Sequence, residues 1–199
     1  NGMDAFHKGV EIDAVYKVNR QISVEGLLSV GDWKWTSADT VRFLDDNNNP
    51  ITDDFGNEII ASFDAEGVHV GDAAQTQYGL SVRFEPTQES YIKLRGTYFD
   101  NYYADFDPLS LNGANAGRES WKIPAYQIFD LHCGYMFKLS DKNKLNIRFS
   151  VLNLLDEMYI SDAQNNDPFN ANYQDFDAKS AGVFFGLGRR MNLSAKFSF

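Results

Sequence analysis

The segment "GRRMNLSAKFSF" (residues 188–199) alternates strictly between apolar and polar residues from Met191 onward. Its odd positions hold Met, Leu, Ala, Phe and Phe, and its even positions hold only Asn, Ser and Lys. A period of two predicts a β-strand with one apolar and one polar face. Phe199 ends this strand with an aromatic ring, the kind of side chain that anchors a strand at a membrane–water boundary.

Six further segments repeat the alternation, and no segment of comparable length has a helical period. They run over residues 10–18, 22–30, 76–84, 92–98, 129–137 and 145–151. The last strand is expected to begin near Ala181, because Val183, Phe185 and Leu187 keep the odd parity and only Arg189 breaks it. The sequence therefore predicts an all-β, antiparallel fold.

The connections between these segments alternate between short and long. The short ones cover residues 19–20, 85–89 and 140–143, and the long ones cover about 36–74, 104–124 and 156–180. Outer-membrane β-barrels have this order, with short periplasmic turns and long extracellular loops. A soluble β-sandwich that binds carbohydrate explains the alternation equally well, but it does not explain the order of the loops.

Composition narrows the class of protein. Of the 199 residues, 43% are hydrophobic and 15% aromatic, so disorder is not expected. The formal net charge of -10 argues against a nucleic-acid partner. Cys133 is the single cysteine, which excludes an internal disulfide framework. No apolar run is long enough for a membrane helix, but a barrel that spans the membrane has the same polar average.

Seven strands cannot close into an antiparallel barrel, because the first and last strands would have to pair in parallel. An open edge in lipid leaves backbone N–H and C=O groups without partners. The sequence therefore predicts that residues 1–199 are the C-terminal part of one larger barrel domain, with further strands before Asn1. In that arrangement the apolar face, including Leu131 and Ile147, faces lipid, and the polar face faces the lumen.

The lipid-facing set is predicted from strand parity as Leu131, Cys133, Tyr135, Leu145, Ile147, Phe149, Leu193 and Phe197. The lumen-facing set is Asp130, His132, Asn146, Arg148, Ser194 and Lys196. Aromatic residues near the strand ends are interpreted as rings at the membrane boundary: Trp33, Trp35, Tyr102, Tyr103, Trp121, Tyr126 and Phe199.

Five segments resemble TonB-dependent outer-membrane transporters in their order and spacing. They are "HKGVEIDAVYKV" (7–18), "AQTQYGLSVRFEP" (74–86), "IPAYQIFDLHCGYMF" (123–137), "SVLNLLDEMYI" (150–160) and "GLGRRMNLSAKFSF" (186–199). Within the fourth, "NLLDEMY" is similar to the family's Asn-Leu-Phe-Asp-x-x-Tyr pattern, with Leu155 in place of Phe. The resemblance covers nearly the whole chain and is closest to Bacteroidetes members of the family.

The resemblance implies a transmembrane β-barrel of about twenty-two strands, of which this chain supplies the last seven. It implies a plug domain and a TonB-contacting segment upstream, and active uptake of a scarce nutrient such as a siderophore–iron complex, cobalamin or an oligosaccharide. The implied location is the outer membrane of a Gram-negative cell, among lipid and lipopolysaccharide, with a surface lipoprotein as a further partner. A passive porin or a barrel adhesin without a plug is the alternative.

The long loops hold the candidate ligand-contacting residues. Aromatic faces and amide side chains there suit sugars or other polar organic ligands, and the candidates are Tyr102, Tyr103, Trp121, Asn165, Asn166 and Tyr173. The other interpretation is that these loops only fold over the barrel mouth.

No catalytic motif, cofactor site or metal site stands out. The acidic stretch "DDNNNPITDD" (45–54) lacks the glycine and glutamate positions of an EF-hand loop, so a solvated surface loop is favoured. His7, His69 and His132 have no ligand spacing, and His132 is expected to face the lumen. Cys133 is expected to be a small lipid-facing apolar residue. An enzyme is not expected.

Overall fold

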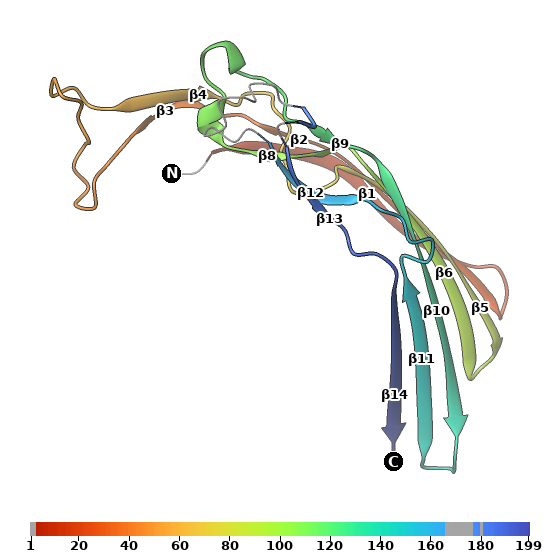
Figure 1. The fold of residues 1–199 in the computed structure, drawn as a ribbon. Helices are drawn as coiled ribbons and strands as arrows, with labels where there is room; N and C mark the ends of the chain where they lie inside the picture. The colour runs from red at the N-terminus through yellow and green to blue at the C-terminus, as the bar shows by residue number, and fades with distance from the viewer. Residues whose placement is uncertain (1–2, 166–176, 180) are drawn as a thin grey trace.

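One seven-stranded antiparallel sheet organises the chain (Figure 1). The computed structural model describes residues 3–165, 177–179 and 181–199. The strands lie in chain order as β1 (Ala5–Lys17), β2 (Ile22–Trp35), β5 (Thr76–Thr87), β6 (Ser90–Asp100), β10 (Tyr126–Lys138), β11 (Lys144–Leu152) and β14 (Arg190–Ser198). The seven predicted segments and their antiparallel pairing are confirmed.

The register aligns like residues across the whole sheet. One row of directly paired positions is apolar in every strand: Tyr16, Val24, Val82, Leu94, Leu131, Val151 and Met191. The next row is polar in every strand: Lys17, Ser23, Arg83, Lys93, His132, Ser150 and Asn192. Because side chains alternate between faces along a strand, the two rows lie on opposite faces of the sheet.

The apolar face is the exposed one. Leu80 and Leu94 are 59% and 45% exposed, whereas Ser81 and Thr97 on the polar face are 4% and 9% exposed. Among the described residues, no second sheet packs against the apolar face. A soluble sandwich buries its apolar face, so the exposure pattern is that of a barrel wall and not of a sandwich.

The first and last strands leave both edges of the sheet open. Within the described residues, β1 pairs only with β2, β14 pairs only with β11, and the two edge strands do not pair with each other. The odd strand count predicted that they would not close on each other.

Short turns and long loops lie at opposite ends of the sheet. The short turns at 18–21, 88–89 and 139–143 lie at the same end as the C-terminus, and the N-terminus lies among the long loops (Figure 1). The predicted alternation of short and long connections is confirmed. The described residues contain no helix that is long and apolar enough to cross a membrane.

The long loops carry secondary structure that the alternation did not predict. β3 (Ala38–Arg42) pairs with β4 (Ile60–Asp64), and β7 (Tyr102–Tyr103) pairs with β9 (Lys122–Ile123). β12 (Ile160–Asn165) lies between β13 (Gly182–Phe185) and β8 (Asp105–Phe106), and two short 3-10 helices, η1 (Pro108–Ser110) and η2 (Gly113–Asn115), follow β8. We call these described loop elements the loop cap.

The last strand does not begin near Ala181, as its parity suggested. β13 belongs to the loop cap, and β14 belongs to the seven-stranded sheet, which we call the wall. Residues 186–189 separate the two strands. Gly186 lies against the Tyr159 ring, where a Cβ has no room, and the Arg189 N–H donates to Asp156 Oδ1 at 2.7 Å. These contacts redirect the chain between the two sheets.

The aromatic residues expected at the membrane boundary mostly lie elsewhere. Tyr102, Trp121 and Tyr126 pack in the loop cap, and Trp33 stacks on His7 at the polar-face end of β2. The rings on the apolar face include Tyr78 and Tyr98 near the loop end, Phe129 and Phe149 between the ends, and Tyr16, Phe84, Tyr135, Phe137 and Phe197 near the turn end. Strand parity separates the rings on the apolar face from those on the polar face or in the loop cap. Closeness to a strand end in the sequence does not.

Candidate functional site

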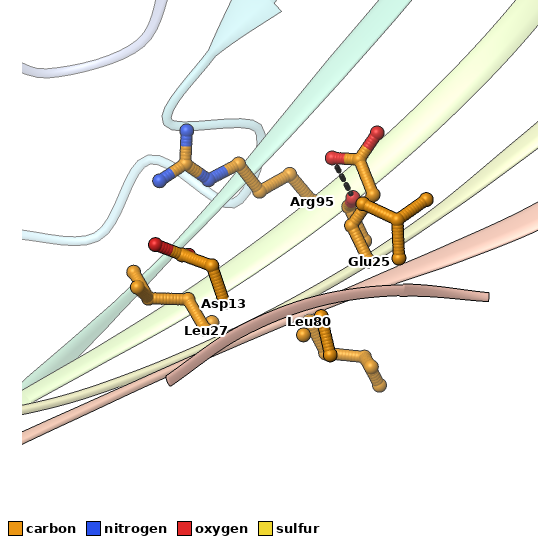
Figure 2. Close-up of a pocket in the computed structure, with 10 residues that line it drawn as sticks. Asp13, Glu25, Leu27, Leu80 and Arg95 are labelled. Atoms are coloured by element: carbon orange, nitrogen blue, oxygen red, sulfur yellow. Dashed lines mark hydrogen bonds between the residues drawn. The ribbon is translucent and has the colours of Figure 1, made fainter. Parts of the chain in front are cut away.

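The polar face of the wall carries a hydrogen-bonded ion pair. Lys93 Nζ lies 2.5 Å from Glu25 Oε2, and the Ser81 hydroxyl donates to the same carboxylate at 3.0 Å. Figure 2 shows Glu25 on the same side of the strands as Asp13 and Arg95, with Leu80 on the opposite side. The close-up therefore displays the parity of the wall directly.

Basic side chains predominate on the polar face from β5 to β14. The Arg83 guanidinium lies 3.9 Å from the centroid of the Tyr91 ring and pairs with Glu85 at 2.9 Å. Arg95 and Arg148 have no salt bridge within the part of the chain that the structure describes. His132 shares a hydrogen bond with Ser150 at 2.9 Å on this same face, where it was expected.

Gln75 joins the wall to the loop cap. It is 1% exposed, its Oε1 accepts the Trp33 N–H at 2.8 Å, and its Nε2 donates to the carbonyls of Trp33 and Val70. Its backbone carbonyl accepts the Gly31 N–H at 2.6 Å. Gln75 thereby satisfies the backbone where β2 leaves β5, and it was not singled out in the sequence because a lone glutamine carries no motif.

His69 lies between two carboxylates at the end of the wall that carries the long loops. Its Nδ1 lies 2.5 Å from Glu119 Oε2, and its Nε2 lies 3.7 Å from Asp32 Oδ1. The ring stacks on Tyr103 with 4.2 Å between centroids and 2° between planes. Burial, and then the Glu119 charge, raise the pKa of Tyr103 above its usual value. This contact holds two loops and β2 together.

A hydrophobic cluster forms one half of the loop cap. Ala74, Tyr102, Ala104, Ile123 and Ala163 form its buried centre, with Trp121 packed at the edge. The Tyr102 hydroxyl donates to the Ser161 carbonyl at 2.9 Å. Burial and nearby Asp162 raise the pKa of Tyr102 to about 12, so this phenol stays protonated at neutral pH.

The structure separates the six candidate ligand-contacting residues. Tyr102 is 8% exposed and lies inside the cluster, Trp121 lies at its edge, and Tyr103 is half-buried against His69. Asn165 ends β12, whose backbone pairs with β8 there. Asn166 and Tyr173 lie outside the described residues. Contact of these six residues with a ligand stays a prediction.

A second cluster forms the other half of the loop cap and borders a cavity. Phe63, Ala65, Val68, Phe106 and Leu111 are buried, and Met3, Trp35 and Leu109 pack against them. The adjoining cavity has a volume of about 550 Å³. No local sequence pattern marks this cavity, because its walls come from four separate stretches of chain.

The acidic stretch 45–54 belongs to a pair of matching turns at the tip of the β3–β4 hairpin. Asp45 Oδ1 accepts the backbone N–H groups of Asn47 and Asn49, and Asp53 Oδ1 accepts those of Phe55 and Asn57. These bonds lower the pKa of both carboxyls. The described residues contain no group of three or more metal-ligating side chains arranged around a common point. The two aspartates hold turns.

The "NLLD" motif has a structural role. Asn153 is 4% exposed, its side chain exchanges hydrogen bonds with the backbone N–H and C=O of Glu157, and its N–H donates to Asp130 Oδ1 at 2.9 Å. Asn153 and Asp156 both have positive φ, at 51° and 58°. The motif therefore closes the tight turn that takes the chain from β11 into the last long loop.

The chain has the fold of one sector of an outer-membrane receptor barrel. It superposes on the siderophore receptor PiuA from Acinetobacter baumannii (TM-score 0.57, 13% identity) and on the ferric yersiniabactin uptake receptor FyuA from Yersinia pestis (0.57, 18%). It also superposes on the ferric-catecholate import receptor Fiu from Escherichia coli K12 (0.53, 12%). Each comparison covers 98% of this chain, and the chain spans 22%, 23% and 21% of those receptors.

The seven-stranded sheet has the fold of part of a β-barrel. At these identities the likeness concerns the fold, and it agrees with the outward apolar face and the open edges of the sheet. No protein-family model and no curated protein matches the sequence.

Proposed function

We propose that this chain forms the C-terminal barrel sector of a TonB-dependent outer-membrane transporter that takes up a scarce nutrient. The proposed nutrient is a siderophore–iron complex, cobalamin or an oligosaccharide. The role of the chain is binding and passage of a solute and not catalysis. Its location is the outer membrane of a Gram-negative bacterium.

The exposure of the apolar face is the observation that carries the proposal. Leu80, Leu94 and Leu193 are 59%, 45% and 74% exposed, while Ser81 and Thr97 on the polar face are 4% and 9% exposed. Apolar area in water is unfavourable by about 25 cal/mol per Å². Hydrocarbon removes this penalty, so a bilayer is the environment that suits the wall.

The open edges support a larger barrel. Each unpaired backbone group in hydrocarbon costs several kcal/mol, so β1 and β14 need further strands in a membrane. The three receptors are four to five times longer than the matched sector. We therefore assign residues 1–199 to the C-terminal part of a barrel domain, with a plug and the earlier strands outside this sector.

The loop cap supports a receptor over a plain porin. Its two buried clusters and the His69 contact hold it in a fixed shape at one end of the wall. A pre-formed cap of this kind suits selective binding, because fewer side chains must be ordered when a ligand arrives. Tyr103, Trp121, Asn165, Asn166 and Tyr173 are our candidates for ligand contacts, together with Tyr102 should the cluster open.

The remaining partners follow from the transporter class. Lipid and lipopolysaccharide surround the wall, the TonB complex acts on the plug through an N-terminal segment, and a surface lipoprotein can cover the cap. The apolar rings at the two ends of the wall, such as Tyr98 and Phe197, suit the two membrane boundaries.

Uptake by intact cells tests the proposal. A strain lacking the gene should lose accumulation of one compound from a panel of ⁵⁵Fe-siderophores, ⁵⁷Co-cobalamin and labelled oligosaccharides, and complementation should restore it. A protonophore or deletion of TonB should abolish the restored uptake. Purified protein in planar bilayers should show no steady conductance. Steady conductance with uptake unaffected by the protonophore identifies a passive porin and contradicts the proposal.

A further inference from the structure

We propose that the cavity between β2, β3 and β8 binds a solute with an apolar or aromatic body and a cationic group. This inference rests on the proposed function and names the chemical class of solute that the loop cap selects.

The walls of the cavity are apolar. Trp35, Phe63 and Phe106 supply the aromatic surface, and Leu109 and Val41 supply the aliphatic surface. The volume of about 550 Å³ falls within the roughly 300–1,000 Å³ typical of small-molecule sites. Trp35 occupies an odd position of β2, in the same parity as Glu25 and Ser23, so the cavity opens on the polar face at the loop end.

The cavity is held in shape before any ligand arrives. Phe63 and Phe106 are only 8% and 5% exposed, because they also belong to the buried cluster around Leu111. The Asp64 N–H donates to the Leu111 carbonyl at 2.9 Å, and Asp107 caps η1 by accepting the Leu109 N–H at 2.9 Å. Binding therefore orders few groups.

Both charged side chains of the cavity are acidic. Asp39 and Asp105 are among the ten described residues that line it, and none of the ten is basic. Neither aspartate forms a salt bridge in the described ranges. Burial, and then the charges of Asp105 and Asp162, raise the pKa of nearby Asp72.

Sequence composition extends this negative charge to the surrounding loop. Residues 36–74 hold nine carboxylates and a single basic residue, Arg42, apart from His69. Arg42 is paired with Glu58 at 3.4 Å. A cation is therefore attracted to the cavity, and an anion is repelled from it.

The indole of Trp35 adds aromatic surface to the cavity. Its Nε1 is buried and has no hydrogen-bond partner among the described residues. Because this atom has almost no accessible surface, a solute in the cavity meets the aromatic surface of the ring and not the N–H. The aromatic face of the ring suits a cation. Apolar walls, an aromatic face and two carboxylates together suit an amphipathic cation.

Three matched probes test the charge preference on the intact protein purified in detergent. Tryptamine is cationic, 3-ethylindole is neutral and indole-3-propionate is anionic, and all three share one ring. Saturation-transfer NMR titrations should give saturable binding for tryptamine and about tenfold weaker binding for the anion, because attraction of the cation and repulsion of the anion at a partly exposed site each change Kd by up to about fivefold.

Two double variants locate the effect. Asp39→Asn with Asp105→Asn should reduce tryptamine binding about tenfold and remove the preference over the neutral probe. Asp46→Asn with Asp54→Asn removes the same charge from the tip of the same hairpin, and it should leave tryptamine binding within about twofold, because salt screens distant exposed charges. The heat-modifiable band on a gel confirms that each variant is folded.

The outcomes separate this inference from the proposed function. Preference for the anionic probe, or a cation preference that survives the Asp39 and Asp105 changes, overturns the cavity assignment while leaving energised uptake intact. Site-dependent tryptamine binding in a protein that shows no TonB-dependent uptake supports the cavity assignment and contradicts the transporter. Binding of all three probes with equal affinity also overturns the inference.

Discussion

The wall exposes its apolar residues, whereas the loop cap buries its own. In the wall, Leu94 and Leu193 are largely exposed and Ser81 is buried. In the cap, Leu111 and Ile123 are completely buried and acidic side chains lie outside. Each region is consistent with its solvent, hydrocarbon for the wall and water for the cap. A pattern of apolar and polar residues therefore has to be interpreted together with the direction in which each face points.

The largest effect is expected from a charge placed on the apolar face of the wall. Ile147→Arg at mid-strand should destabilise the protein folded in lipid vesicles by about 2–4 kcal/mol, because the cation enters hydrocarbon. Asn146→Arg, one residue away on the polar face, should change stability by less than about 1 kcal/mol. Urea unfolding followed by tryptophan fluorescence measures both. Equal losses for the two variants mean that the faces are not in different solvents.

The joint between the wall and the cap gives the next largest effect. Gln75→Ala leaves the Trp33 N–H and the Val70 carbonyl without their side-chain partner and removes one of the two bonds to the Trp33 carbonyl, so a loss of about 1–3 kcal/mol is expected. Gln77→Ala removes one 3.3 Å bond to the Ala74 carbonyl and should cost less than about 1 kcal/mol. Hydrogen exchange should show faster exchange in residues 31–35 and 70–75 for the Gln75 variant only. Unchanged exchange there shows that the cap does not depend on this residue.

Asp72 tests the negative potential of the cap. Its folded-state pKa is raised from 3.8 by burial and by Asp105 and Asp162, so its ionisation opposes folding once the pH exceeds 3.8. Asp72→Asn should therefore raise the thermal midpoint at pH 7, and the gain should disappear as the pH falls below the unfolded-state value. Thermal scans across pH 3–8 measure this. A midpoint that is lower than wild type at pH 7 contradicts the charge assignment.

The smallest effect is expected from the ion pair of the polar face. Lys93 and Glu25 remain 23% and 39% exposed, and partly exposed pairs contribute less than about 1 kcal/mol. Lys93→Ala should accordingly shift stability by under about 1 kcal/mol, and the shift should shrink in 1 M salt. A salt-insensitive loss above that range means that the interior of the wall is shielded from water.

The sequence predicted nearly all of the wall. An alternation of apolar and polar residues identifies both a strand and the residues on each of its faces. The seven strands and the placement of His132 and Cys133 on opposite faces follow from parity, and the turn ends follow from the alternation of short and long connections. The error at Ala181 has a physical origin. Parity continues through residues 182–187, but Gly186 and the Asp156 contact turn the chain out of the wall.

The loop cap could not be predicted in the same way. Its strands are two to six residues long, too short for a periodic signal, and its clusters join residues far apart in the sequence, such as Phe63 with Leu111. Tyr102 was predicted as a ligand contact from its type alone, and the structure places it in the packed interior of the cap. The cavity at Trp35 combines four loop stretches, so no local pattern marks it.

Site-directed spin labelling of β10 and β11 tests most directly whether the apolar face meets lipid. Single cysteines at 130, 131, 132, 146, 147, 148 and 149 in a Cys133→Ser background, and the native Cys133 of the unchanged protein, are labelled in the intact protein in outer-membrane vesicles. Collision with oxygen should be high at 131, 133, 147 and 149, and collision with a water-soluble nickel complex should be high at 130, 132, 146 and 148. A uniform pattern, or the reverse phase, contradicts the outward apolar face and with it the barrel wall.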